Sequence, residues 1–453
     1  MDWFKRMFGA QVPTWLRATR LALFALLLAA CVIRVWLVVA YNPMDLLDTD
    51  PGRHWILGTT PLSTQPFAAI DPIGYHVFVG MLAKVSSGSR ILVAYWTALL
   101  SLACPWIWYR FLRELIPGRD WALAGWAILA VLPSWSAIYS YFMQETLMLP
   151  LLGAALWATW RARRKRDTGS FVLAVFAWIL AGLTRGICIP LAAVAMTWLW
   201  ILQDGKLKKA VVSCVLLLAI LGPLGGRSWY LIRQVAPHGL GTMNELYARS
   251  GAASFTISFT RQGGKSRWSY IFQSPAIESR PLAPLSDWQS SRLGRVHFDI
   301  DIDAGRRDWK IAEEGLPPWT VRRYLWLTGD NMVPLLFGSS WPDTNQTRAI
   351  GVANYWLRWM WVPLALACLV ATIWLRHRQR ERMLAGLLLT WFVAQALLPL
   401  AVNEGRYRKP FEGLLVAQCL LLASSSRRHK RVQNNDADRA VQEDVPHAAN
   451  ANA

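Results

Sequence analysis

Ten apolar stretches follow one another along this chain and limit what it can fold into. A helix needs roughly 20 apolar residues to cross the hydrocarbon layer of a bilayer. The stretches lie at about 20–41, 90–112, 120–138, 142–160, 170–184, 186–203, 210–225, 353–375, 383–402 and 410–424. Of the 453 residues, 54% are hydrophobic and only 17% are charged, which is typical of polytopic membrane proteins. The sequence therefore predicts an all-α membrane protein with about ten transmembrane helices.

The basic residues predict how these helices are oriented. The formal net charge is +20, and much of the excess lies in short runs beside the apolar stretches, at 161–166, 206–209, 376–382 and 427–431. Cytoplasmic loops of membrane proteins carry an excess of Lys and Arg. Ten spans with the amino terminus inside place all of these runs in the cytoplasm, so we expect a multi-pass plasma (inner) membrane protein with both termini cytoplasmic. Because the charge flanks membrane helices, no nucleic-acid partner is expected.

The same topology divides the chain into four parts. We expect an amino-terminal membrane module of seven spans, an extracytoplasmic domain, a carboxyl-terminal module of three spans and a disordered cytoplasmic tail, at 1–225, 226–352, 353–424 and 425–453. The first outer loop, 42–89, contains a short apolar run over 73–85. That run is too short to be a span, so it predicts a helix lying at the membrane interface.

The domain 226–352 is expected to be mixed in structure. Aspartates alternate with isoleucines from Asp299 to Asp303, which predicts a strand. The same spacing also fits a set of calcium ligands, so both interpretations remain open for this segment.

Three carboxylates gather immediately after the first span, at Asp45, Asp48 and Asp50. Ionisable groups so close to lipid are costly, which makes them functional-site candidates by default. Asp50 is our first choice for a catalytic base and Asp48 the second, because in an extended segment the two side chains would point the same way. Asp45 is interpreted as a solvated residue at headgroup level. The alternative for all three is a turn or helix-cap role, since Asp before Pro51 and Gly52 is ordinary turn chemistry.

The last outer connection, 403–410, is basic where the topology expects few basic residues. Its cations are Arg406, Arg408 and Lys409. A bound phosphate would explain them, because the planar fork of arginine donors suits a phosphate group. Contact with lipid headgroups is the alternative, and the loop alone leaves both open.

Four short motifs occur in order along the chain: Asp48-Thr49-Asp50, Asp71-Pro72-Ile73-Gly74-Tyr75-His76, Leu183-Thr184-Arg185 and Arg406-Tyr407-Arg408-Lys409-Pro410. This set resembles the GT-C class of integral-membrane glycosyltransferases, in the branch of protein mannosyltransferase-like and aminoarabinose-transferase-like enzymes. The resemblance covers about 40–425. It departs from the family pattern where Ile73 and His76 replace prolines and where Arg53-His54-Trp55 replaces an aromatic pair.

The resemblance implies an enzyme that moves a sugar from a polyprenyl-phosphate donor to an extracytoplasmic glycan, lipid or protein, with inversion at the anomeric carbon. The leaving phosphate is stable as an anion, so the reaction needs a base for the acceptor proton and cations for the phosphate. The candidate bases are Asp50 and Asp48, and a divalent metal held by these two is an optional cofactor. The candidate donor phosphate-binding residues are Arg406, Arg408, Lys409 and Arg185. The candidate substrate-binding residues are Tyr75, His76, Glu145, Tyr407 and His54.

Two other functions are weighed against this hypothesis. A lipid-linked polysaccharide polymerase or ligase would also use outer arginines, but it would take a lipid pyrophosphate donor and would not need Asp48 or Asp50. A lipid-sugar transporter usually places polar residues at mid-membrane in repeated, broken helices. This chain has its carboxylates at the outer boundary and shows no internal repeat, which favours an enzyme.

Overall fold

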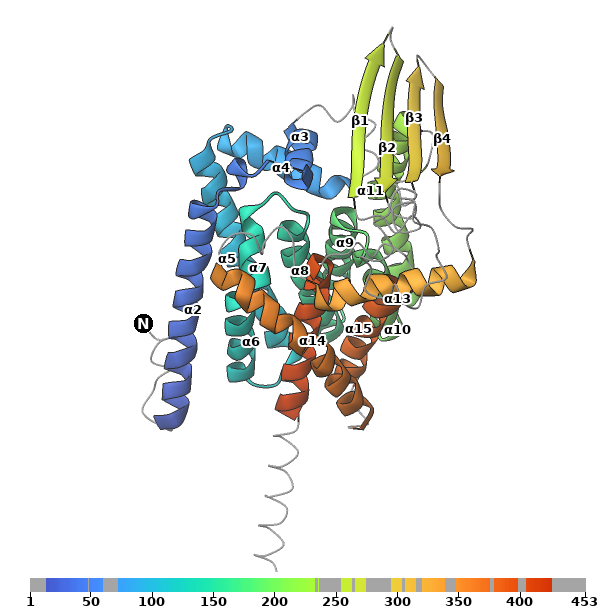
Figure 1. The fold of residues 1–453 in the computed structure, drawn as a ribbon. Coiled ribbons are helices and arrows are strands. Elements are labelled where there is room, and N and C mark those ends of the chain that lie inside the picture. The colour runs from blue at the N-terminus through green and yellow to red at the C-terminus, as the bar shows by residue number, and fades with distance from the viewer. Residues whose placement is uncertain are drawn as a thin grey trace, which may run out of the picture.

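The computed structural model describes residues 14–47, 49–59, 72–232, 235, 254–262, 265–273, 295–303, 306–314, 320–338, 348–374, 379–397 and 405–425. These parts of the chain are predominantly helical, with one four-stranded sheet (Figure 1). The fold class predicted from the apolar stretches is therefore confirmed in its coarse form, as a mostly helical protein.

Helical structure lies over part or all of each predicted span, although the bounds differ by up to seven residues and 120–138 is divided between two helices. The longer helices are α2 (Thr14–Ala40), α5 (Arg90–Leu115), α8 (Glu145–Lys165), α9 (Thr168–Thr184), α11 (Lys206–Ile232), α14 (Arg348–Trp374), α15 (Gln379–Leu397) and 409–425. The shorter ones are η1 (Pro43–Asp45), α3 (Thr49–Thr59), α4 (Ile73–Ser86), α6 (Arg119–Val131), α7 (Pro133–Ala137), η3 (Ile138–Ser140), α10 (Cys188–Ile201), α13 (Val321–Phe337) and η6 (Gly405–Arg408).

Four helices in the described residues are long and apolar enough to cross a membrane, and a bent pair makes a fifth if it counts as one span. The four are Ala18–Asp45, Arg90–Leu115, Lys206–Tyr230 and Arg348–Ile373, and the bent pair is α6 with α7. A short helix is present over the predicted run 73–85, as α4. These helices are consistent with a membrane protein.

The predicted span 120–138 is broken rather than continuous. Helix α6 ends at Val131, and α7 starts at Pro133 in a direction that differs by 62°. Proline has no N–H to continue the helix ladder, so carbonyls in the last turn of α6 lose their partners. The guanidinium of Arg34, from the middle of α2, donates to the carbonyls of Leu129 and Ala130 at 3.0 and 2.8 Å. An arginine thus takes the place of the missing backbone donors inside an apolar bundle.

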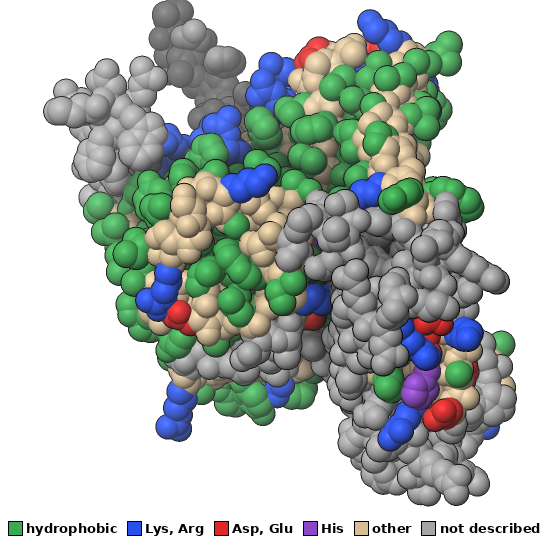
Figure 2. All heavy atoms as spheres, turned by 90° about the horizontal axis from the view of Figure 1, so that it is seen from above, with side chains coloured by type: hydrophobic (Ala, Val, Ile, Leu, Met, Phe, Trp, Pro, Cys, Tyr) green, Lys and Arg blue, Asp and Glu red, His purple; other side chains and the backbone are tan. Residues whose placement is uncertain are grey.

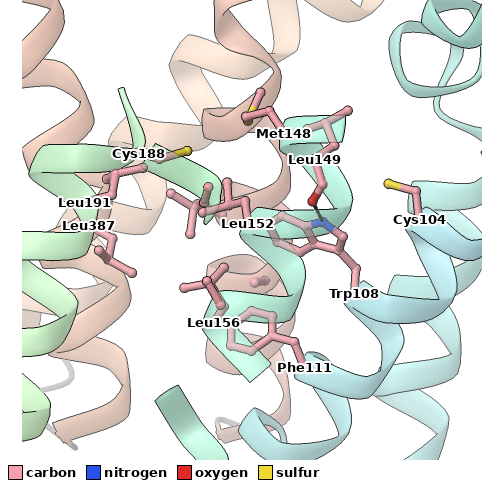
Figure 3. Packing of buried hydrophobic residues seen from close by; sticks show 14 of the residues in the cluster. Cys104, Trp108, Phe111, Met148, Leu149, Leu152, Leu156, Cys188, Leu191 and Leu387 are labelled. Atoms are coloured by element: carbon pink, nitrogen blue, oxygen red, sulfur yellow. Dashed lines mark hydrogen bonds between the residues drawn. The ribbon is translucent and has the colours of Figure 1, made fainter. Parts of the chain in front are cut away.

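Trp108 on α5 lies at the centre of the buried core (Figure 3). It is fully buried, and its indole N–H donates to the carbonyl of Leu149 at 2.9 Å, which joins α5 to α8. Leucines and other apolar side chains from α8 and α10 surround it in the same cluster. This packing of α5 against α8 fixes the helix that carries one of the candidate site residues.

Basic residues from α2, α8 and α15 lie at one end of the bundle, which we call the basic end. Arg20 near the start of α2 pairs with Asp120 at the start of α6 at 2.8 Å. Arg164 in the last turn of α8 pairs with Glu114 at the end of α5 at 2.6 Å. Arg380 at the start of α15 donates to the carbonyl of the last residue of α5. Figure 1 shows these helix ends together at the bottom of the bundle.

The sheet stands at the opposite end, where α3 and α4 also lie (Figure 1). It is an antiparallel meander in the order β1 (Ser254–Gln262), β2 (Lys265–Gln273), β3 (Arg295–Asp303), β4 (Arg306–Glu314). The strand predicted over 299–303 is therefore confirmed as part of β3. Asp299 accepts hydrogen bonds from Ser269 and Arg267 on β2, so the guanidinium of Arg267 balances the charge of its carboxylate. Seen from this end, side chains of both charges gather over the sheet (Figure 2).

Helix α3 corrects the expectation of an extended segment after the first span. The chain is helical from Thr49, with Pro51 in the first turn, where its missing N–H costs nothing. A Cβ on Gly52 would lie 1.7 Å from the carbonyl oxygen of Leu47, so only glycine permits this tight entry into α3. A Cβ on Gly80 of α4 would lie 2.6 Å from the backbone oxygen of α3 residue Gly58. Backbone contact of this kind locks α3 onto α4.

Candidate active site

Four segments that are far apart in the sequence bring charged side chains together at the sheet end of the bundle. They are α3, the first turn of α8, the end of α9 and η6. We call the group Asp50, Glu145, Arg185, Arg406 and Tyr407 the charged cluster. All five were singled out in the sequence, and the structure brings them into mutual contact.

The pair Asp50–Arg406 joins the two motifs most distant in the sequence. Arg406 Nη2 lies 2.9 Å from Asp50 Oδ2, although the residues are 356 positions apart. The other carboxylate oxygen, Oδ1, accepts from Arg53 at 3.0 Å. Side-chain exposure is 13% for Asp50 and 7% for Arg406, so little solvent screens the pair. Both oxygens of the candidate base are therefore held by guanidinium groups.

Glu145 forms the second ion pair of the charged cluster. It begins α8, is fully buried and accepts a short hydrogen bond from Arg185, the residue that follows α9. Arg406 Nε lies 3.9 Å from the same carboxylate oxygen, Oε1. The second oxygen, Oε2, is buried and has no hydrogen-bond partner among the described residues. Glu145 thus keeps one acceptor position that a substrate hydroxyl fits.

The ring of Tyr407 connects the two arginines. The guanidinium carbon of Arg185 lies 4.2 Å from the ring centroid, and that of Arg406 lies 5.2 Å from it. Arg406 also donates to the Tyr407 hydroxyl at 3.3 Å. Stacking on an aromatic face lowers the energy of a guanidinium and limits its orientation. Tyr407 therefore holds two like charges close together, as binding of one anion by both would require.

His54 and His76 form a buried pair beneath Asp50. His54 Nδ1 lies 3.2 Å from His76 Nε2, and the two residues are 2% and 1% exposed. The His54 ring also meets Tyr75 edge to face, and the Tyr75 hydroxyl accepts from Thr146 at 3.3 Å. These contacts join α3 to α4 and α4 to α8. The three predicted substrate-binding residues in this group therefore lie in the buried contact between α3, α4 and α8, and His54 is close enough to Asp50 to interact with its charge.

Burial and neighbouring charges shift the pKa values of two side chains on α3, Asp50 and His54. Burial alone would raise the pKa of the Asp50 carboxyl, but Arg53 and Arg406 outweigh it and hold that pKa below its ordinary value. Burial lowers the pKa of His54 well below its ordinary value, and the nearby Arg53 and His76 add to the shift. At neutral pH the site accordingly contains an ionised Asp50 and an uncharged His54.

Arg408 and Lys409 have different surroundings from Arg406. Arg408 donates to Glu412 at 2.9 Å and to the carbonyls of Leu335 and Leu336 at the end of α13. Ser134 on α7 donates to the other oxygen of Glu412 at 2.7 Å. The structure therefore places Arg408 in a separate buried network that anchors η6 to α13. Lys409 is fully buried next to η6, and its charge acts on Glu145.

One of the three predicted carboxylates, Asp45, does not join the charged cluster. Asp45 lies near the surface and pairs with Arg90 at the start of α5. Asp48 lies outside the residues that the structure describes. Over the described ranges, no three His, Cys, Asp or Glu side chains converge on a metal position. The optional metal of Asp48 and Asp50 stays a prediction.

Arg53 and Glu412 are the polar neighbours that sequence reasoning did not assign. Arg53 lies three residues after Asp50, and Glu412 four residues after Arg408. These spacings place ion-pair partners on one face of a helix. The signal was present in the sequence, but it becomes visible only once 49–59 and 405–425 are recognised as helical.

The charged cluster with Arg53 holds three guanidinium groups against two carboxylates, so it has a positive excess that favours an anionic ligand. It also offers one carboxylate that is ionised at neutral pH and could accept a proton. Comparisons of the chain with protein-family models, with curated proteins and with solved structures give no match.

Proposed function

We propose that this chain is a membrane glycosyltransferase that moves a sugar from a polyprenyl-phosphate donor to an extracytoplasmic acceptor. The observation that carries the proposal is the 2.9 Å ion pair between Asp50 and Arg406. One is the candidate base and the other the candidate phosphate ligand, and each was chosen from a different motif. If one site both removes the acceptor proton and stabilises the departing phosphate, the base and the phosphate ligand must lie next to each other, as these two residues do.

The proposed reaction is one displacement at the anomeric carbon. The acceptor hydroxyl gives its proton to Asp50 as its oxygen bonds to the anomeric carbon. The bond between that carbon and the phosphate oxygen breaks, and its electron pair leaves with the polyprenyl phosphate. Arg406 and Arg185 stabilise the charge that grows on the departing phosphate. Glu145 Oε2 accepts a hydrogen bond from a sugar hydroxyl.

The proposal includes the finer topology, with ten spans, the charged cluster on the extracytoplasmic face and the sheet above it. Helix α8 supports this arrangement, because it begins at Glu145 in the charged cluster and ends in the basic run of Arg163, Arg164 and Lys165. Cytoplasmic ends of spans are enriched in Arg and Lys, so the opposite end of α8 belongs outside. The sheet stands at that same end and is available to select the acceptor.

The test starts with cells that contain or lack the protein. Mass spectrometry of surface glycans, lipids and proteins should show one added sugar only when the protein is present. Membranes with Asp50→Asn should lose that sugar, whereas the matched variant Asp45→Asn should keep it. Full transfer by a folded Asp50→Asn protein would overturn the base assignment, and a requirement for a lipid pyrophosphate donor would favour a polymerase or ligase instead.

A further inference from the structure

We infer that the donor phosphate switches the base on: in the empty site Asp50 and Arg406 neutralise each other, and donor binding exchanges the carboxylate for the phosphate on Arg406. This inference rests on the proposed function and adds regulation of the same site. It makes the acceptor reaction dependent on a bound donor.

The geometry provides the exchange. Asp50 is held on both oxygens, by Arg406 at 2.9 Å and by Arg53 at 3.0 Å. A carboxylate that accepts a charge-assisted hydrogen bond on each oxygen is a weaker base, so it is a poor proton acceptor for an incoming hydroxyl. Arg406, in turn, cannot offer its full fork to a phosphate while one N–H is committed to Asp50.

Arg406 also lies near the other members of the charged cluster, which are Glu145, Tyr407 and Arg185. Its Nε is already 3.9 Å from Glu145, and its guanidinium shares the Tyr407 ring with Arg185. A phosphate bound between the two arginines therefore draws Arg406 toward the ring and away from Asp50. Arg53, on the same helix as Asp50, stays behind and keeps the carboxylate ionised.

The exchange has an energetic consequence that can be measured. If Asp50 competes with the phosphate for Arg406, the apparent donor affinity is reduced by the fraction of sites in which the ion pair is closed. Removing the carboxylate's charge should then strengthen phosphate binding, whereas a carboxylate that only supports the site would weaken it when lost. The two roles predict changes of opposite sign.

The experiment uses the full chain in detergent and farnesyl monophosphate as the probe, with farnesol as the uncharged control. Binding is measured by thermophoresis for the wild type, Asp50→Asn, Arg406→Ala and the double variant. We expect Asp50→Asn to bind farnesyl monophosphate about fivefold or more tightly than the wild type, a size typical of coupling between two sites. Arg406→Ala should weaken binding about tenfold. Adding Asp50→Asn to Arg406→Ala should not increase the affinity of that variant.

The controls separate failure of the inference from failure of the proposed function. Asp45→Asn should leave the affinity unchanged, and thermal unfolding should verify that each variant is folded. If Asp50→Asn leaves phosphate affinity unchanged or lowers it, the exchange is wrong while phosphate binding stands. If the wild type binds farnesol as tightly as farnesyl monophosphate, the phosphate site itself is wrong. Asp50→Ser provides a second uncharged variant if the Asn protein does not fold.

Discussion

Arg34 and Arg406 are both almost fully buried, at 1% and 5% exposure, but they have different partners. Arg34 lies within α2 and donates to backbone carbonyls at the break between α6 and α7, and to Ser101. Arg406 pairs with Asp50 and lies close to Glu145. Arg34 supplies hydrogen bonds to backbone carbonyls, whereas Arg406 neutralises carboxylates.

The difference shows which buried arginine a ligand can recruit. The carbonyls of Leu129 and Ala130 accept from Arg34 where Pro133 ends the helix ladder, so moving Arg34 would remove these hydrogen bonds inside an apolar bundle. The carboxylate of Asp50 retains Arg53 when Arg406 moves away. Burial alone therefore does not identify a functional arginine, and the chemistry of its partners does.

The largest expected effect is on folding and comes from Arg34→Met. Removing the guanidinium leaves several buried carbonyls without donors, and each costs about 1–3 kcal/mol. We expect the variant to lose about 3–5 kcal/mol of unfolding free energy, or to fail to accumulate as folded protein. Denaturant titration in detergent measures this loss. Arg20→Met at the basic end is the matched control and should be nearly neutral; equal loss in both variants would contradict the special role of the break.

The next effect is on catalysis and comes from Asp50→Asn. Loss of a general base typically lowers the rate by about 10²–10⁴-fold. We expect the transfer rate to fall by this amount while the fold is kept, since the amide is nearly isosteric with the carboxylate. Single-turnover transfer with the donor identified by mass spectrometry measures the rate. An unchanged rate would place Asp50 with Arg34, among the structural residues.

A smaller effect is the pH dependence of stability through His54. Its pKa is lowered in the folded protein, chiefly by burial, so below about pH 6.5 the unfolded chain binds a proton that the folded chain does not. Unfolding free energy should therefore fall as pH falls below that value, by up to about 1.4 kcal/mol per pH unit. His54→Gln should reduce this dependence of the unfolding free energy on pH. Denaturant titrations at pH values between about 5 and 8, where histidine ordinarily titrates, measure it. His297→Gln, on the sheet, should retain it.

The smallest effect belongs to the exposed pair Asp45–Arg90. Surface ion pairs are screened by solvent and contribute little. Asp45→Asn should change neither transfer rate nor unfolding midpoint, both measured beside the wild type. A large loss of activity in this variant would mean that the wrong carboxylate of the acidic segment has been assigned as the base.

The helices over the apolar stretches could be predicted because hydrophobic length is a strong local signal. Arg34 shows the limit of that signal. A single arginine inside an apolar run is visible in the sequence, but its partners come from α5, α6 and α7, which only the fold brings together. The break at Pro133 was missed for the same reason, because a span interrupted by proline has the same composition as a continuous one.

The site was predictable as a set of residues but not as an arrangement. Motif order pointed to Asp50, Arg185 and Arg406, the family resemblance implied Glu145, and these four residues lie together. Arg408 belongs to the same motif as Arg406 yet faces a different network, because residues two positions apart in the 3-10 helix η6 point in different directions. Helix α3 was not recognised because Asp50, Pro51 and Gly52 at its start are also the residues of a turn.

The length of helix α8 sets the distance between the basic end and the charged cluster. Its 21 residues correspond to roughly 31 Å, about the thickness of the hydrocarbon layer of a bilayer. In the proposed topology, the basic end of α8 lies at one surface and Glu145 lies at the other, at the level of the phosphates. A lipid donor could then be used without extraction from the membrane, its tail remaining among the other tails. Removing one turn from α8 would draw the same charges about 5 Å inward, where no phosphate resides.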